Sequence, residues 1–263
     1  MNELKYIDIG LNLANKQFKR DRDEVVKNSY DNNIGFIITG TDKRANYEAL
    51  NLCDEYNNYP IYCTCGIHPH NADDWNDEYK NIIIQQLRSD DKYIKAIGEI
   101  GLDYDRMYSK KENQLECFDE MLSLAEEFNK PVFLHERSAV EDFIKVLKNH
   151  RKLCNRAVVH CFTGNRATVL RYLNLGCYIG ITGWICDSRR NKDLVDALKV
   201  IPLERLMIET DAPYLTPMGK GLERRNIPNN IIYVAEEIAK IKNVSVKEVQ
   251  EKCLSNTIKF FNL

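Results

Sequence analysis

Eight short apolar runs alternate with amphipathic stretches along the chain, and this alternation limits the folds that the sequence can adopt. Each run is rich in β-branched residues and is bounded by polar or turn-forming residues, as expected of buried strands. The runs cover residues 6–13, 35–41, 61–66, 94–102, 131–135, 157–162, 178–182 and 206–210. Strands that alternate with helices favour a parallel sheet, either a closed (β/α)8 TIM barrel or a doubly wound open sheet. The length of 263 residues suits the barrel, whose usual size is about 250 residues.

The stretches between the runs have helical periodicity. Leu115, Phe118 and Leu122 are spaced by three or four residues, which places them on one face of a helix. We expect helices over residues 21–32, 46–56, 114–128, 140–147, 194–200, 230–241 and 246–260. Because no low-complexity linker or change of composition divides the chain, we expect residues 1–263 to form a single domain.

Composition and charge exclude several classes of protein. No apolar run of about 18 residues occurs, so no transmembrane helix is expected, and the charged N-terminal segment does not resemble a signal peptide. The simplest location is therefore the cytoplasm. The nine cysteines include no Cys-x-x-Cys pair, which argues against a thiolate zinc site and favours reduced, buried thiols. A net charge of −2 means that any nucleic acid must be bound through a local site.

Polar side chains close several of the apolar runs. The clearest are Glu99, His135, His160 and Asp211. In a closed barrel these run ends meet at one mouth, whereas an open sheet spreads them along an edge. Two imidazoles and two carboxylates form a donor set for a divalent cation, because imidazole suits borderline ions and carboxylate suits magnesium and manganese. Two ions bridged by Glu99 would match the two-metal scheme for displacement at phosphorus.

Each of these residues alone also has a purely structural explanation. A histidine at a strand end is often a hydrogen-bonded core residue, and an acidic residue there is often the N-cap of the next helix. The four together favour a shared metal site, because burying so much polarity without a use is costly. His68, after the third run, could donate to a substrate phosphate or reach the metal. Arg224 and Arg225 form either a phosphate clamp or a solvated loop.

Five motifs in this chain resemble those of the TatD-type deoxyribonucleases. They are Gly-Ile-His-Pro-His (66–70), Gly-Glu-Ile-Gly-Leu-Asp (98–103), Pro-Val-Phe-Leu-His-Glu-Arg (131–137), His-Cys-Phe-Thr-Gly (160–164) and Glu-Thr-Asp-Ala-Pro-Tyr-Leu (209–215). Arg-Arg-Asn (224–226) follows, so the resemblance runs in order over nearly the whole chain. Residues 8–13 and 179–187 are most similar to the bacterial branch associated with single-strand exonuclease and DNA-repair roles.

This resemblance implies an amidohydrolase-type barrel and a metal-dependent deoxyribonuclease, expected to act as a 3′–5′ exonuclease on single-stranded DNA ends. It implies that Glu99, His135 and His160 are metal ligands and that Asp211 is a ligand or the base that orients water. His68 and Arg137 would lie beside the substrate phosphate, and Glu209 or Glu136 would orient the imidazoles. Magnesium or manganese is the expected ion, with zinc as an alternative. A monomer is expected.

The sequence departs from the family pattern at two places. Most relatives carry His-x-His at the end of the first strand, where this chain has Gly10-Leu11-Asn12, and the acidic residue after Arg-Arg-Asn is replaced by Ile227. Because Gly10 offers no side-chain ligand, we expect one ion held firmly and a second held loosely through Asp211, Glu99 and water.

Two other functions remain open from the sequence. The same barrel could hydrolyse a small-molecule amide or ester, but such sites usually use strand-one imidazoles and a modified lysine on strand four, where this chain has Glu99. A binding module without catalysis is the second alternative. The joint presence of Glu99, His135, His160 and Asp211 argues against it.

Overall fold

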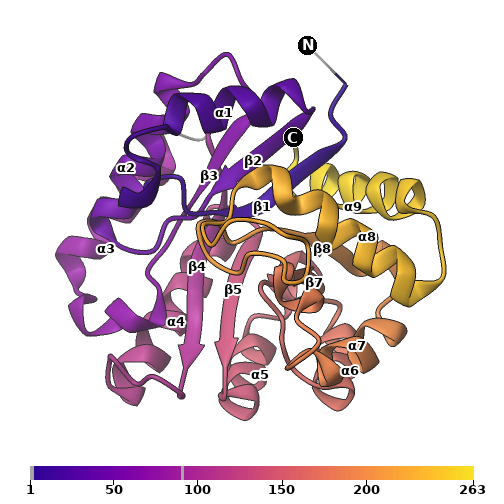
Figure 1. The fold of residues 1–263 in the computed structure, drawn as a ribbon. Coiled ribbons are helices and arrows are strands. Elements are labelled where there is room, and N and C mark those ends of the chain that lie inside the picture. Colours follow the sequence, from indigo (N-terminus) through magenta and orange to yellow (C-terminus); the bar gives the residue numbers. More distant parts are fainter. Residues whose placement is uncertain (1–2, 90–91) are drawn as a thin grey trace.

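The computed structural model describes residues 3–89 and 92–263 and contains an eight-stranded parallel sheet rolled into a nearly closed barrel (Figure 1). The strands are β1 (Tyr6–Leu11), β2 (Ile34–Ile38), β3 (Ile61–Cys65), β4 (Ile94–Asp103), β5 (Val132–Arg137), β6 (Ala157–Val159), β7 (Tyr178–Ile181) and β8 (Leu206–Ile208). They pair in sequence order, each parallel to the next. The barrel expected from the alternating pattern is confirmed, and the open sheet is excluded.

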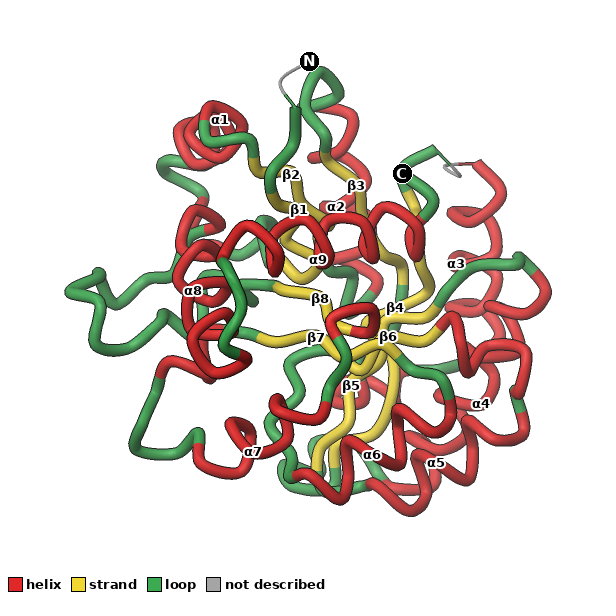
Figure 2. Tube along the Cα trace, turned by 90° about the vertical axis from the view of Figure 1, so that its right-hand side faces the viewer, coloured by secondary structure: helices red, strands yellow, loops and turns green. Residues whose placement is uncertain are grey.

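Helices surround the barrel on its outside (Figures 1 and 2). They are α1 (Arg22–Asp31), α2 (Lys43–Glu55), α3 (Asp77–Ser89), α4 (Lys111–Glu127), α5 (Val140–Asn149), α6 (Arg166–Leu175), α7 (Lys192–Val200), α8 (Ile231–Lys242) and α9 (Val246–Phe261). Helices α3 and α6 were not among those expected. In α3 the three consecutive isoleucines, Ile82, Ile83 and Ile84, obscure the helical period of its apolar positions.

Several strands end earlier than the expected runs, and two of them matter for the mouth of the barrel. β6 stops at Val159 and β8 at Ile208, whereas the expected runs continue to residues 162 and 210. Past these ends the chain turns, since Cys161 and Asp211 have φ angles of 46° and 53°, in the left-handed region. The turns carry the polar residues that follow β6 and β8 away from the sheet ladder and into the mouth of the barrel.

A buried carboxylate joins the first and last strands. Asp8 of β1 accepts hydrogen bonds from the backbone N–H groups of Thr210 at 2.9 Å and Gly10 at 3.2 Å, and from the Thr210 hydroxyl. Nearer the mouth, the Asp211 N–H donates to the Gly10 carbonyl at 2.8 Å. Side-chain and backbone hydrogen bonds therefore close the barrel between β1 and β8.

Loss of the Asp8 carboxylate should destabilise the fold more than loss of a surface carboxylate. Asp8→Ala leaves buried donors on Thr210 and Gly10 without an acceptor, at an expected cost of about 2–4 kcal/mol. Asp31→Ala is the matched control, because among the described residues the Asp31 side chain makes only an exposed pair with Lys27, worth at most about 1 kcal/mol. Urea unfolding compares the two, and equal losses would contradict the role of Asp8 at this junction.

The same residue should make stability depend on pH. Burial raises the pKa of Asp8 from 3.8 to about 8, although the hydrogen bonds from Thr210 and Gly10 oppose the rise. Between these values the folded state keeps a proton that the unfolded state releases, so stability should fall as pH rises, by up to about 1.4 kcal/mol per pH unit. Asp8→Asn should flatten this part of the profile.

Two apolar clusters fill the molecule. The larger one lies between the strands and the surrounding helices. The smaller one collects side chains from seven of the strands together with Phe261 of α9, which places it inside the barrel: Ile7, Ile9, Ile37, Ala96, Phe133, Val158, Tyr178 and Met207. The barrel interior is thus a packed core rather than a pore, and polar chemistry is restricted to its two ends.

The expectation of reduced, mostly buried thiols is met within the described residues. All nine cysteines are free thiols, and seven of them are buried. None of the helices in residues 3–89 and 92–263 is long and apolar enough to cross a membrane.

Candidate metal centre

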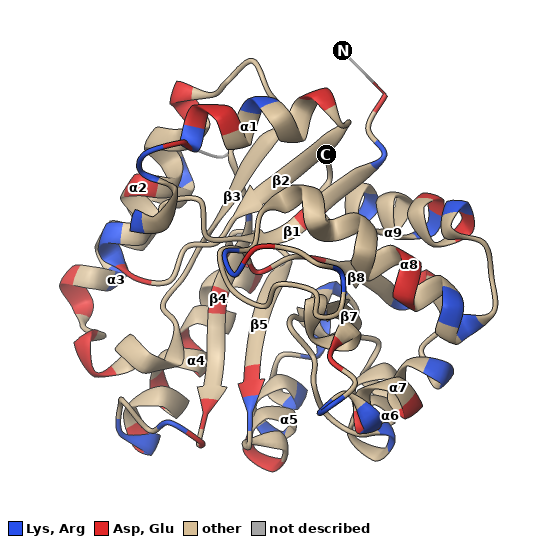
Figure 3. Cartoon of the chain, in the orientation of Figure 1, with Lys and Arg blue, Asp and Glu red and all other residues tan. Residues whose placement is uncertain are grey.

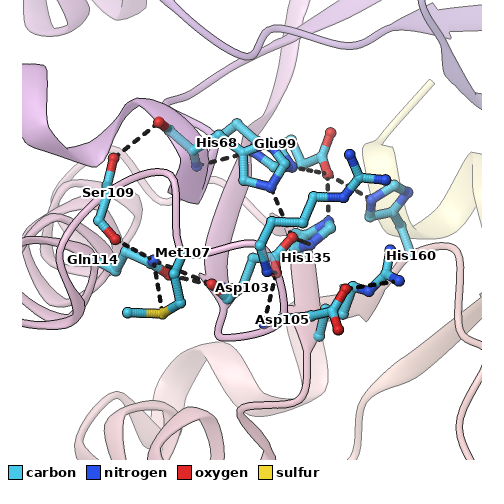
Figure 4. Close-up of polar contacts among 12 residues, drawn as sticks. His68, Glu99, Asp103, Asp105, Met107, Ser109, Gln114, His135 and His160 are labelled. Carbon is cyan, nitrogen blue, oxygen red and sulfur yellow. Dashed lines mark hydrogen bonds and ion pairs between the residues drawn. The ribbon is translucent and has the colours of Figure 1, made fainter.

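Three imidazoles surround one carboxylate at the mouth of the barrel (Figure 4). Glu99 of β4 places Oε1 2.8 Å from His160 Nε2, 2.9 Å from His135 Nδ1 and 3.2 Å from His68 Nε2. His135 is on β5, His160 directly follows β6, and His68 follows β3. The carboxyl ends of neighbouring parallel strands thus bring these four residues together, as expected for this fold.

The charges of this cluster depend on one another. Burial alone would raise the pKa of Glu99, but the imidazoles of His160 and His68 and a hydrogen bond from His135 hold that pKa well below its usual range. Burial opposes the positive charge of His160, yet Glu99 and Glu209 raise the pKa of His160 well above its usual value. Burial instead lowers the pKa of His68. The site therefore holds an ionised carboxylate beside imidazoles of unequal basicity.

Glu209 fixes the orientation of His160. One of its oxygens lies 3.3 Å from His160 Nδ1, and the other accepts the backbone N–H of Cys161 at 2.5 Å. Because Glu209 holds one proton on Nδ1, a cation bound at the centre would replace only the Nε2 proton that His160 shares with Glu99. A carboxylate that holds a histidine in this way is the usual partner of a metal-binding imidazole.

The glycine at the end of the first strand makes room for Glu209. A Cβ atom on Gly10 would overlap one Glu209 carboxylate oxygen, and a Cβ on Gly180 of β7 would lie 2.5 Å from the other. Gly10 therefore leaves the space that is taken by the buried carboxylate of Glu209, which directly follows β8. Asn12, two residues later, donates to Asp211 Oδ1 at 2.8 Å.

The tautomer of His68 is set by its own loop. The backbone N–H of His70 donates to His68 Nδ1 at 3.1 Å, so a neutral His68 carries its proton on Nε2, facing Glu99. His68 is therefore suited to donate a hydrogen bond, although its ring also lies close enough to Glu99 and His135 to count as a metal ligand by distance alone.

Asp103 forms a second carboxylate layer below the imidazoles. Its Oδ2 atom lies 2.7 Å from His70 Nε2 and 3.4 Å from His135 Nε2, and its side chain is buried. Burial alone would raise the pKa of Asp103, but hydrogen bonds from His135, Arg106 and His70 lower it strongly. Asp103 closes the motif of residues 98–103, although its sequence position alone predicted no role for it.

Asp211 lies at the same mouth without a direct contact to Glu99 among the described residues. It follows β8, is partly buried, and accepts the hydrogen bond from Asn12. Burial raises its pKa to about 7, with His160 opposing the rise and Glu99 and Glu209 adding to it. An acid with this pKa exchanges protons near neutral pH, which is the property of a general base.

The three arginines proposed for phosphate contacts differ in their surroundings. Arg137, at the end of β5, is exposed and lies 2.9 Å from Asp105, and Arg224 is exposed with no side-chain partner in the described part of the chain. Arg225 instead binds Asp21 through two nitrogens and the carbonyl of Gln17. Its guanidinium already serves to fasten the loop after β8 to the start of α1.

The residues of this mouth fit a divalent cation. His68, Glu99 and His135 offer ligand atoms that all lie within 4.8 Å of one another. Within residues 3–89 and 92–263, His135 Nε2 is buried and makes only the long 3.4 Å contact with Asp103 Oδ2, so this nitrogen lacks a well-formed hydrogen bond. A buried donor set of imidazole and carboxylate is typical of such sites.

The family model described as TatD related DNase matches residues 7–262. The chain belongs to the TatD-related DNase family. A protein of Erwinia amylovora named 3′-5′ ssDNA/RNA exonuclease TatD is 40% identical over 260 residues, which cover 97% of this chain and 99% of that protein. The protein of the same name from Escherichia coli K12 is 41% identical over 236 residues, covering 88% and 89% of the two chains.

Solved structures agree with this membership. The crystal structure of a TatD family hydrolase from Entamoeba histolytica is 30% identical, covers 98% of both chains and superimposes with a TM-score of 0.90. The chain is thus a member of a family of hydrolytic nucleases, as its motifs predicted. These relatives give no support to the alternative of a small-molecule amide or ester hydrolase.

Sequence reasoning missed the residues that support the centre from outside it. Asn12 and Asp103 were not assigned roles, and Glu209 was proposed together with Glu136. Glu136 in fact accepts hydrogen bonds from Ala139 N–H and the Tyr172 hydroxyl, so it faces the helices. Asp103 lies at the end of its strand, as the proposed ligands lie at or just after the ends of theirs. That position could have identified it as a candidate site residue.

Proposed function

We propose that this chain is a metal-dependent 3′–5′ exonuclease that removes nucleotides from single-stranded DNA ends. The observation that carries the proposal is the buried Glu99 carboxylate with three imidazoles within 3.2 Å of one oxygen, in a chain of the TatD-related DNase family. The polarity and strand preference rest on relatives about 40% identical that carry the name 3′-5′ ssDNA/RNA exonuclease.

We assign the metal to Glu99, His135 and His160, with Asp211 as a weaker ligand. A divalent cation bound there would polarise a phosphoryl oxygen and lower the pKa of a bound water. The hydrogen bond from His160 to Glu209 directs the other imidazole nitrogen toward Glu99, which supports His160 as a ligand. Magnesium or manganese is the proposed ion, since carboxylates supply much of the charge in the site.

We assign the remaining steps to side chains of this chain. Asp211, with its pKa near 7, accepts a proton from the attacking water. His68 donates from Nε2 to a phosphate oxygen, because the His70 N–H occupies its other nitrogen. Arg137 and Arg224 are exposed at the mouth and are proposed to bind flanking phosphates. All these groups come from one chain, which supports an active monomer.

End-labelled oligonucleotides test this function directly. With magnesium or manganese present, a 5′-labelled single strand should give a ladder of products shortened from the 3′ end, and a blunt duplex should be cut about tenfold more slowly, because its paired end must first unstack. Single-stranded RNA of the same sequence measures the preference for deoxyribose over ribose. EDTA should abolish cutting of every substrate.

A 3′-phosphorothioate linkage is the matched control, because it should block digestion of an otherwise identical strand. Rapid cutting of closed circular single strands, or release of 5′-terminal nucleotides first, would contradict the proposed polarity.

A further inference from the structure

A polar pocket lies at the end of the barrel opposite the metal centre. It has a volume of about 520 Å³ and is formed where strands begin, beside the last residues of α9. Five of its lining residues are cations: Lys95, Lys130, Arg156, Arg205 and Lys259. Among the described residues that line it there is no carboxylate. Its size falls within the range of about 300–1,000 Å³ usual for small-molecule sites.

This concentration of charge contrasts with the rest of the molecule. The chain has 37 basic and 39 acidic residues, and Figure 3 shows both signs spread over the outer helices. Four of the five pocket cations stand at or just before the starts of β4, β5, β6 and β8, so the barrel itself gathers them at one end. A concave site lined by charges of one sign concentrates ions of the other sign.

Neutral groups hold the two guanidinium groups in place. Arg156 donates to the side-chain oxygen and the carbonyl of Asn129, and Arg205 donates to the Gly176 carbonyl at 2.9 Å. Neither forms an ion pair with a carboxylate in the described part of the chain, and the same holds for the exposed Lys259. These cations are therefore oriented without being neutralised, which prepares them for an anionic ligand.

An aromatic wall adjoins these charges. Phe260 is partly exposed and packs edge-on against Tyr178 with ring centroids 5.2 Å apart, while Arg205 lies over the Tyr178 ring. Asn129, Asn155 and Asn262 add amide groups that can donate and accept hydrogen bonds. Cations suit a phosphate, and a partly exposed ring with nearby amides suits a base.

We propose that this pocket binds a free nucleoside monophosphate, with its phosphate at Arg156, Arg205 and Lys259 and its base against Phe260. The site lies at the opposite end of the barrel from Glu99 and does not involve the proposed metal ligands. The inference goes beyond the proposed function and does not depend on it, so each can fail without the other.

Calorimetric titration of the full chain in EDTA tests the site, because chelation removes any metal-dependent binding at the other mouth. 5′-dAMP is the main probe, with deoxyadenosine, inorganic phosphate and a 5′-phosphorylated single strand as comparisons. Lys259→Glu should weaken 5′-dAMP binding by about tenfold, as expected of a two-unit change in charge beside a phosphate. Arg205→Gln should weaken it as well.

Two control variants separate this site from the rest of the surface and from the metal centre. Lys145→Glu makes the same charge change on the exposed face of α5 and should leave binding unchanged within about twofold. His135→Ala should also bind 5′-dAMP as the wild type does, because His135 lies at the other mouth. Inorganic phosphate and deoxyadenosine should each bind more weakly than 5′-dAMP.

Several results would overturn the proposal. These are absence of 5′-dAMP binding in EDTA, equal losses in Lys259→Glu and Lys145→Glu, or loss of binding in His135→Ala. If inorganic phosphate bound as tightly as 5′-dAMP, the pocket would be an anion site to which the base makes no contribution. If the 5′-phosphorylated strand bound and free 5′-dAMP did not, the ligand of this pocket would be a strand end rather than a free nucleotide, and the proposal would be wrong.

Discussion

Glu99→Gln should reduce nuclease activity by about a thousandfold or more with either magnesium or manganese. The amide keeps the size of the side chain but removes the negative charge of the carboxylate, whose Oε1 atom lies 2.8 to 3.2 Å from a nitrogen of each of three imidazoles. It also replaces an acceptor by a group that donates hydrogen bonds, which disrupts any metal coordination by this residue. Rates on a labelled single strand, normalised to the folded fraction, measure the effect.

Metal titration by calorimetry gives the same prediction an independent readout. We expect the wild type to bind one ion firmly, with a second ion visible only when a nonhydrolysable oligonucleotide is present, and Glu99→Gln to bind none firmly. Glu127→Gln, an exposed change of the same chemistry on α4, should behave as the wild type. A Glu99→Gln rate above a tenth of the wild-type rate would refute the assignment, and two tight, substrate-independent ions in the wild type would refute the single firm site.

The sequence predicted the barrel and the mouth because both depend on local patterns. Alternating strand and helix periods define the fold, and polar residues at strand ends must meet wherever a parallel sheet closes. That reasoning brought Glu99, His135 and His160 together, and the structure places them in contact. It also identified His68 as a possible donor, and the hydrogen bond from His70 supports that interpretation.

Sequence patterns did not predict the contacts between distant parts of the chain. Gly10 was interpreted only as a lost ligand, and the sequence did not reveal that Glu209, 199 positions later, packs against it. Arg225 looked like a phosphate clamp, but it is paired with Asp21 in the loop before α1. Pairings of this kind depend on which strand ends become neighbours and on side-chain direction, and neither has a local signal.

Asn12 defines the surroundings of the Asp211 carboxylate. Asn12, which stands where relatives have a second histidine, donates to Asp211 Oδ1, and the other oxygen accepts no hydrogen bond from residues 3–89 and 92–263. Such a carboxylate is positioned by one hydrogen bond and keeps one oxygen for water. Asp211→Asn should therefore reduce kcat by about 10²–10⁴-fold, the usual contribution of a general base, with a much smaller change in KM.

The pH profile distinguishes a base from a group that only shapes the site. Burial raises the pKa of Asp211 to about 7, so kcat should rise with pH as this group loses its proton and level off above that value. A firmly bound cation favours the ionised carboxylate and moves the rise to lower pH, and the rise should move back toward 7 as the metal concentration is reduced. Asp211→Asn should remove the rise altogether, whereas Asp105→Asn, an exposed carboxylate near the same mouth, should keep it. If Asp211→Asn lost activity but kept the wild-type profile, Asp211 would be a ligand or a structural residue rather than the base.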